Sequence, residues 1–242
     1  MLVITDNDPA KASALAEKLG REIFALRHQT VTPHLSVDQA LDRALAVDGG
    51  PVVLADVADN AGGGAPSDST FILKRAVERG IRSVAIGSFW DPLAVRICKE
   101  AGVGASFDLR IGGKCGKASG DPVDLRVTVR AVTDKLTQTG NNGGQIAMGE
   151  AVWIEGAGID MIVNTLRGQT YAPDAFTNLG LDPTKRKIVV VKSTQHFHAR
   201  FAPFAKEILY VSTPGAIPPD FADIAFTKKT VPFWPRVENP FN

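Results

Sequence analysis

A compact group of residues that could do chemistry lies between positions 56 and 70. It contains the carboxylates of Asp56 and Asp59, the amide of Asn60, the glycines Gly62, Gly63 and Gly64, and the hydroxyls of Ser69 and Thr70. Glycine lets a backbone approach a ligand closely, and free N–H groups at the start of a helix attract an anion. This glycine loop is therefore predicted to hold a carboxylate or a phosphate. The alternative is a tight crossover turn in which Asp68 caps the following helix.

The carboxylates of Asp56 and Asp59 form the only acid pair that follows a predicted strand. Such a pair can do acid–base work when its two pKa values differ. Their spacing along the chain does not fix their geometry, and Asp56 could equally brace the glycine loop. The loop lacks both the Gly-Lys-Ser/Thr ending of a P-loop and the G-x-G-x-x-G spacing of a dinucleotide site. The chain also has no G-x-S-x-G elbow, so serine hydrolase chemistry is not predicted.

A second candidate segment is Gly112-Gly113-Lys114-Cys115-Gly116-Lys117. Its glycine spacing is one residue short of a Walker A motif, and strands rather than a helix are predicted after it, so nucleotide binding is not expected here. Two interpretations of Lys114 stay open. The lysine either faces an anionic ligand from a flexible loop or belongs to a basic surface hairpin.

The third candidate segment runs from 192 to 201 and contains Lys192, Ser193, His196 and His198. It follows an apolar run that predicts a buried strand, so it lies at the carboxyl end of that strand, where α/β proteins place their sites. Two imidazoles alone make an incomplete zinc site, and the chain has no H-E-x-x-H motif. We therefore predict no metal ligands in this chain. The alternative is a mixed set of structural and surface polar residues.

Strand and helix patterns alternate through the first hundred residues. Short strands are predicted at 2–5, 51–55 and 83–87, and helices at 8–26, from 36 onward, at 69–79 and at 91–101. The first and last of these helices open with an Asp-Pro pair, and the second opens with the capping box Ser36-Val37-Asp38-Gln39. Strands that alternate with helices pair in parallel, with the helices on the faces of the sheet.

After about residue 105 the pattern changes to a period of two. Further strands are predicted at 107–111, 123–129, 145–154 and 159–165, and the loop at 141–144 is typical of a hairpin. A short helix near 174–178 and strands at 187–191 and 208–211 follow. The predicted fold class is α/β, a mixed sheet with parallel strand–helix units first and an antiparallel meander in the middle.

Composition narrows the classes of function. The 242 residues include 27 Lys and Arg against 26 Asp and Glu, a net charge of +1 that argues against nucleic acid as the main partner. The two cysteines, Cys98 and Cys115, form no C-x-x-C pair, so a reducing compartment is the default. The sequence shows no signal peptide and no apolar run long enough to span a membrane. We expect a soluble cytoplasmic protein.

Four groups of residues together resemble a known family. They are Pro51 to Thr70 with the glycine loop, Ala101-Gly102-Val103-Gly104-Ala105 leading to Lys114, Val191 to Phe197 continuing to Phe201-Ala202-Pro203, and Thr213-Pro214-Gly215 with Trp234-Pro235. In order and spacing these residues resemble the C-terminal domain of the MlrC family, the microcystin-degradation-type metallopeptidases. The resemblance covers about residues 51 to 235, so we expect residues 51–242 to form this domain. Residues 1–50 resemble only the end of the family's N-terminal domain.

The resemblance implies a zinc enzyme whose Asp and His ligands lie in the N-terminal domain, outside this sequence. The residues it carries over face that metal site and are expected to hold a substrate carboxylate or oxyanion. They are Asp59, Asn60, Gly62, Gly63, Gly64, Ser69, Thr70, Lys114, Lys192, Ser193 and His196. None of them is expected to be a catalytic or metal-binding residue by itself.

Two hypotheses of function follow. In the first, the chain is the C-terminal, substrate-orienting half of an MlrC-like zinc metallopeptidase or amidohydrolase that cleaves peptide or amide bonds. It is then inactive without the metal-bearing half, and its partners are that half or a second copy of the chain, together with a peptide-like or carboxylate-bearing substrate. In the second, it is a non-catalytic module whose glycine loop binds a small anion. A self-contained phosphate-handling enzyme that uses Asp56 and Asp59 is a third, weaker idea. Neither nucleic acid nor a membrane is an expected partner.

Overall fold

The computed structural model describes residues 1–241, which form two compact units, one of Met1–Pro33 and one that begins at His34. The first unit contains helix α1 (Pro9–Ala25). Its start agrees with the prediction, because the Asp8 carboxylate accepts a hydrogen bond from the Lys11 amide at 2.9 Å and proline occupies the first turn. The strand predicted at 2–5 is wrong, since the described part of this unit contains no second strand to pair with it.

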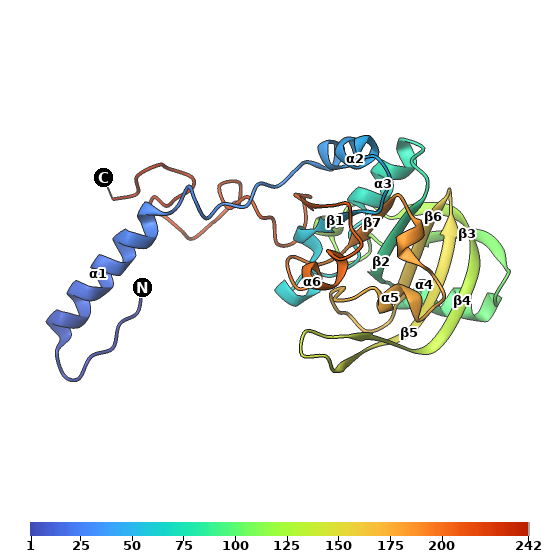
Figure 1. Ribbon diagram of the computed structural model, residues 1–242, viewed down its shortest axis with the longest axis horizontal. Coiled ribbons are helices and arrows are strands. Elements are labelled where there is room, and N and C mark those ends of the chain that lie inside the picture. Colours follow the sequence, from blue (N-terminus) through green and yellow to red (C-terminus); the bar gives the residue numbers. More distant parts are fainter. Residues whose placement is uncertain (242) are drawn as a thin grey trace. The chain divides into compact units, whose positions relative to one another are not determined.

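The second unit is built on one eight-stranded sheet with strand order β3-β4-β5-β6-β2-β7-β1-β8. Its strands are β1 (Val52–Asp56), β2 (Val84–Trp90), β3 (Ser106–Ile111), β4 (Val123–Thr139), β5 (Gln145–Gly156), β6 (Ile159–Asn164), β7 (Ile188–Val191) and β8 (Glu207–Val211). Strands β6, β2, β7, β1 and β8 pair in parallel, and β3 to β6 form an antiparallel meander. The predicted α/β class with a mixed sheet is thus confirmed (Figure 1).

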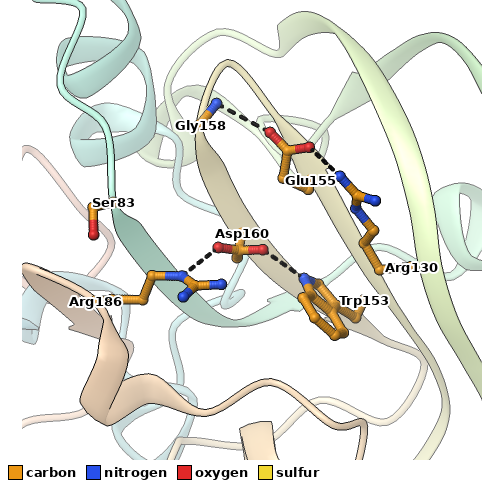
Figure 2. A pocket seen from close by; sticks show the side chains of 7 residues that line it. All are labelled: Ser83, Arg130, Trp153, Glu155, Gly158, Asp160 and Arg186. Carbon is orange, nitrogen blue, oxygen red and sulfur yellow. Dashed lines mark hydrogen bonds and ion pairs between the residues drawn. The ribbon is translucent and has the colours of Figure 1, made fainter.

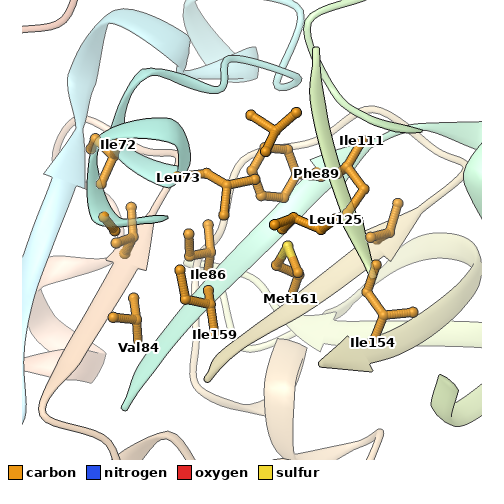
Figure 3. Close-up of a cluster of buried hydrophobic side chains, with 14 of the residues drawn as sticks. Ile72, Leu73, Val84, Ile86, Phe89, Ile111, Leu125, Ile154, Ile159 and Met161 are labelled. Carbon is orange, nitrogen blue, oxygen red and sulfur yellow. The ribbon is translucent and has the colours of Figure 1, made fainter. Parts of the chain in front are cut away.

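Helices cover both faces of the sheet. They are α2 (Val37–Ala46), α3 (Phe71–Glu78), α4 (Pro92–Ala101), α5 (Asp174–Thr177) and α6 (His198–Phe201). The first three pack in the larger apolar core, together with side chains from one face of the sheet such as Ile86 and Met161 (Figure 3). The last two pack in a second core that includes Phe176, Phe197 and Phe201. Burial on both faces explains why β7 is apolar along its whole length and why β1 is apolar up to its last residue, Asp56.

Most elements match the prediction, including the capping box at Ser36 and the proline start of α4. The predicted domain boundary at residue 50 stays a prediction, and the division into compact units falls at Pro33. The short helix α6 was not predicted, and it begins at His198, two residues after His196. Among residues 1–241, no helix has both the length and the apolar character needed to cross a membrane.

Candidate substrate-facing site

The candidate residues gather at the carboxyl edge of the parallel strands. The chain leaves β1 at Asp56, β7 just before Lys192, and β8 just before Thr213. Because β1 lies between β7 and β8, the segments after these three strands meet at one edge. This is the edge at which open α/β sheets present their ligand sites.

Asp59 organises the glycine loop from within. One carboxylate oxygen accepts the Ser67 amide at 2.8 Å, and the other accepts the Ser69 amide at 2.8 Å and the Lys192 ammonium at 2.8 Å. The residue is 1% exposed. A charged acceptor makes stronger hydrogen bonds than a neutral one, so this single carboxylate fixes the path of the chain from the loop into α3.

Lys192 is the cation that pairs with both Asp59 and Asp56. It is 1% exposed, and its ammonium donates to Asp59, to Asp56 at 3.3 Å and to the Ser69 carbonyl at 2.7 Å. Asp56 also accepts the Thr213 hydroxyl at 2.8 Å, which joins the segment after β8 to the same centre. The Asp56–Asp59–Lys192 centre therefore holds three separate segments of the chain together.

Burial and charge shift the pKa values of this centre. Burial raises the pKa of the Asp56 carboxyl, against the opposing effect of the Lys192 ammonium. Burial lowers the pKa of Lys192, but the carboxylates of Asp59 and Asp56 outweigh it and raise that pKa above its ordinary value. The lysine thus stays charged at neutral pH, and its fully buried ammonium cannot reach a substrate in solvent. Its role here is to position the loop.

The amides of the glycine loop are already engaged. The Gly62 amide donates to the Asn60 side chain at 2.9 Å, and the amides of Gly63 and Gly64 donate to backbone carbonyls of the same loop. The Thr70 amide donates to the Ser119 carbonyl at 3.0 Å. An anion at this loop would have to compete with these bonds, so exposed side chains are better placed than the backbone to bind a ligand.

Beside the loop lie two short groups of interacting polar side chains. The Asn60 side-chain amide donates to the Thr194 hydroxyl at 2.8 Å, and the Ser193 hydroxyl donates to the side-chain amide oxygen of Gln169 at 3.0 Å. Gln169 in turn donates to the Tyr171 hydroxyl at 2.9 Å, and the Tyr171 ring stacks on His196, with centroids 5.7 Å apart. We call these six residues the polar rim: Asn60, Gln169, Tyr171, Ser193, Thr194 and His196.

The polar rim combines fixed and accessible groups. Ser193 is fully buried and Gln169 nearly so, whereas Thr194 and His196 are exposed. The polar rim also requires glycine at position 62, because a Cβ there would lie 2.3 Å from the Gln169 side-chain nitrogen. A stacked tyrosine–histidine pair with a supported hydroxyl can present both an apolar face and hydrogen-bonding groups to a ligand.

Lys114 and Thr70 lie on the same edge but in a separate network. The Lys114 ammonium pairs with buried Asp91 at 2.6 Å, and Asp68 accepts the backbone amides of Lys114 and Cys115. Asp68 therefore anchors the 112–117 loop, and the alternative in which it caps α3 is wrong, because the helix N-cap is Thr70. The Thr70 hydroxyl donates to the backbone carbonyl of Asp121 at 2.7 Å and makes no hydrogen bond to Asp56, Asp59 or Lys192 among those of the described residues.

A metal ion does not fit the residues of this edge. Both oxygens of Asp59 and both oxygens of Asp56 already accept hydrogen bonds from protein donors. The His196 ring is stacked on a tyrosine rather than aimed at these carboxylates. Within residues 1–241, no group of three or more His, Cys, Asp or Glu side chains could hold a metal ion. No step of a reaction is therefore assigned to a metal bound by this chain.

A cavity of about 480 Å³ lies at the opposite edge of the sheet. Figure 2 shows that its charged side chains point toward one another. Arg186 pairs with Asp160 at 2.6 Å, Arg130 pairs with Glu155 at 2.9 Å, and the Trp153 indole donates to Asp160. Since its charges are paired internally, this cavity offers little to a charged ligand, and the carboxyl edge remains the candidate site.

Sequence reasoning missed four residues of the site, Gln169, Tyr171, Thr194 and Thr213. Thr213 belongs to the Thr213-Pro214-Gly215 motif, and its place next to a strand end was the available indication. Gln169 and Tyr171 come from the segment between β6 and α5, which carries no distinctive pattern. Their partners are distant in sequence, so only the fold reveals them.

Comparison with known proteins now decides the family. The family model described as the MlrC C-terminus matches residues 54–228. The chain belongs to the MlrC family. Microcystinase C from Sphingomonas sp. is 34% identical over 237 residues, which cover 97% of this MlrC chain and 46% of that protein. The crystal structure of a candidate metallopeptidase from Mesorhizobium sp. BNC1 superposes with a TM-score of 0.78 at 26% identity, covering 91% of the MlrC chain and 44% of that protein.

The MlrC chain therefore spans about half the length of the relatives it matches. These metallopeptidase-like relatives suggest a metal in the full enzyme, whereas the described residues of this chain contain no cluster that could bind one. The similarity includes the whole carboxyl edge described above, because the family match begins within β1 and ends beyond Thr213.

Proposed function

We propose that this chain is the C-terminal, substrate-orienting half of an MlrC-type metallopeptidase or amidohydrolase that acts on peptide or amide bonds. The metal, proposed to be zinc, would be held by the other half of the enzyme. The observation that carries the proposal is the polar rim, a partly accessible set of hydrogen-bonding side chains next to a buried, internally ion-paired centre. Such a surface is suited to orienting a substrate and not to activating water.

The solvent exposure of each site residue indicates whether it supports the loop or can contact a substrate. Asp59, Lys192 and Ser69 are buried and fix the backbone of the loop, whereas the buried Thr70 hydroxyl bonds to the carbonyls of Ser119 and Asp121. His196 and Thr194 are exposed and can contact a substrate directly. Lys114 reaches solvent in part, although its ammonium is paired with Asp91. We propose that His196 donates to a carbonyl or carboxylate oxygen of the substrate, and that buried members of the rim hold the imidazole and the tyrosine ring in place.

Rigid support matters because orientation itself contributes to rate. A substrate held in a reactive geometry avoids much of the entropic cost of bringing the reacting groups together. The rim is supported by hydrogen bonds from Asn60 to Thr194 and from Ser193 to Gln169, so its exposed groups are held by residues buried beneath them. This arrangement favours a positioning role over a purely structural one.

A non-catalytic module that binds a small anion is the second candidate function. The partly exposed Lys114 ammonium and the exposed glycines favour it. The engaged amides of the loop weigh against it, because the backbone donors that such a module would use are already occupied. The two functions differ in one respect that can be measured, namely turnover in the presence of the other half.

The test is hydrolysis by a reconstituted enzyme. The chain is mixed with the part of Sphingomonas microcystinase C that lies outside the matched region, and release of new amino groups from microcystin and from linear peptides is followed. We expect turnover with both polypeptides present and none with either alone. Ligand binding that stabilises the chain with no turnover in the mixture would instead support the anion-binding module.

The cytoplasmic location stays a prediction from composition. It is consistent with the two cysteines, which are free thiols, Cys98 buried and Cys115 exposed. Burial raises the pKa of the Cys98 thiol to about 11, so this residue is inert at neutral pH.

A further inference from the structure

Helix α1 carries an apolar stripe that its own unit leaves uncovered. The stripe follows helical spacing and consists of Ala12, Leu15, Ala16, Leu19, Ile23 and Leu26. No residue of the helix is buried, and Leu15, Ile23 and Leu26 are 39%, 57% and 46% exposed. A helix in a protein gains most of its stability by packing such a face, so an uncovered stripe indicates a missing partner.

The polar side of α1 carries charges of both signs, with a net charge of only +1. The basic residues are Lys11, Lys18 and Arg21, and the acidic ones are Glu17 and Glu22. Lys18 forms an ion pair with Glu22, and Arg21 forms one with Glu17, each across one helical turn. Helices that lie on anionic membranes have a strongly basic polar face. The balanced charge of α1 therefore argues against a membrane as the occupant of the stripe.

A second copy of the chain is also a poor occupant. The helix has 17 residues, fewer than three heptads, whereas stable coiled coils repeat their apolar positions over three or four. Two of the six stripe residues are alanines, which add little buried area to a helix–helix seam. The stripe is better suited to a larger surface that brings its own apolar groove.

We infer that the apolar stripe of α1 docks onto the half of the MlrC enzyme that this chain does not cover. The inference rests on the proposed function, and it names the surface through which the two halves join. The relatives carry slightly more than half of their length outside the match, which is enough for a domain with its own core. The match to microcystinase C includes 97% of this chain, so it extends into the α1 region.

The test measures binding without relying on activity. The 242-residue chain is titrated with the unmatched part of Sphingomonas microcystinase C, and the dissociation constant is measured by analytical ultracentrifugation. We expect a one-to-one complex, weakened at least tenfold by Ile23→Asp and by Leu19→Asp. The matched control is Ala14→Asp, which places the same charge on the opposite, exposed face of the helix and should leave binding within twofold.

A second readout guards against a variant that perturbs the helix. Hydrogen exchange of the α1 amides in the unmodified chain should slow by tenfold or more when the partner polypeptide is added. Three results would overturn the inference. No complex forms, Ile23→Asp and Ala14→Asp change the dissociation constant equally, or the chain self-associates through α1. A complex that forms through α1 but shows no hydrolysis would refute the proposed function alone, whereas hydrolysis unaffected by Ile23→Asp would refute only the docking surface.

Discussion

Replacing Lys192 by methionine removes the one cation of the Asp56–Asp59–Lys192 centre at nearly constant side-chain length. The ammonium makes three hydrogen bonds, at 2.7 Å to the Ser69 carbonyl, 2.8 Å to Asp59 and 3.3 Å to Asp56. Methionine leaves two carboxylates facing each other in the protein interior. Removing one partner of a buried ion pair costs about 3–5 kcal/mol, most of which is the desolvation of the charge left behind.

This loss is large against the total stability of a domain. Folded domains are stable by about 5–15 kcal/mol, and in a chain of this size 1 kcal/mol shifts the melting temperature by about 2–4 °C. Lys192→Met is therefore expected to lower the melting temperature by about 6–20 °C. Thermal unfolding followed by circular dichroism gives the melting temperature, and urea unfolding extrapolated to zero urea gives the free energy of unfolding.

Two matched variants make the result specific. Lys117→Met removes an exposed lysine and should change the free energy of unfolding by less than about 0.5 kcal/mol. The double variant Lys192→Met with Asp56→Asn should lose less than the sum of the two single losses, because it no longer buries two unpaired charges. A loss below about 1 kcal/mol for Lys192→Met would refute the view that ion pairing by this ammonium stabilises the buried carboxylates.

Three further predictions concern the same edge of the sheet. Raising the pH should weaken the Asp56–Asp59–Lys192 centre. Folding raises the pKa of Lys192 above its ordinary value of 10.5. The stability that the charged lysine contributes is therefore fully present below pH 10.5 and is lost as the pH rises through the folded-state pKa. The gap in unfolding free energy between the unmodified chain and Lys192→Met should thus narrow above pH 10.5, and a constant gap would contradict this assignment. Gly62→Ala should cost about 1–3 kcal/mol, because its Cβ would meet Gln169, whereas Gly168→Ala, with no atom within 4 Å, should be nearly neutral in the same urea assay. In the reconstituted enzyme His196→Ala should raise KM about threefold to tenfold with kcat little changed, unlike Lys185→Ala at the opposite edge, and an unchanged KM would remove His196 from the substrate-binding surface.

Local patterns were sufficient to predict most of the elements. The Asp-Pro starts of α1 and α4 and the capping box of α2 depend on neighbouring residues, and these predictions were confirmed. The strand at 2–5 failed because a strand needs a partner, and partner choice is not a local property. The fold class followed from the change of hydrophobic period near residue 105, which separates the parallel units from the meander.

The site was predictable as a set of segments and not as a geometry. Asp59 and Lys192 are 133 positions apart, and they meet because β7 pairs beside β1. Nothing in the sequence marks Lys192 as buried, since lysine is almost always exposed unless it is paired. Its burial changes its interpretation from a substrate-binding cation to a positioning residue, whereas the exposure of His196 agrees with direct contact.

The glycine loop shows the same limit. Three successive glycines suggested free amides that could hold an anion, but the Asn60 side chain and the loop carbonyls accept those N–H groups. The carboxylate of Asp59 binds two further amides, at Ser67 and Ser69, much as a bound anion would. The protein thus supplies its own anion at this loop. The spacing of the residues along the sequence does not predict this contact.

The assignment of the metal to the other half of the enzyme is tested by the metal content of the purified chain without a histidine tag, measured alone and in complex with the unmatched part of microcystinase C. Elemental analysis is made after both samples are equilibrated with zinc and freed of unbound metal. We expect no stoichiometric metal in the chain alone and at least one metal ion per complex. About one metal ion per chain in the absence of the partner would contradict the assignment of this chain as the substrate-orienting half.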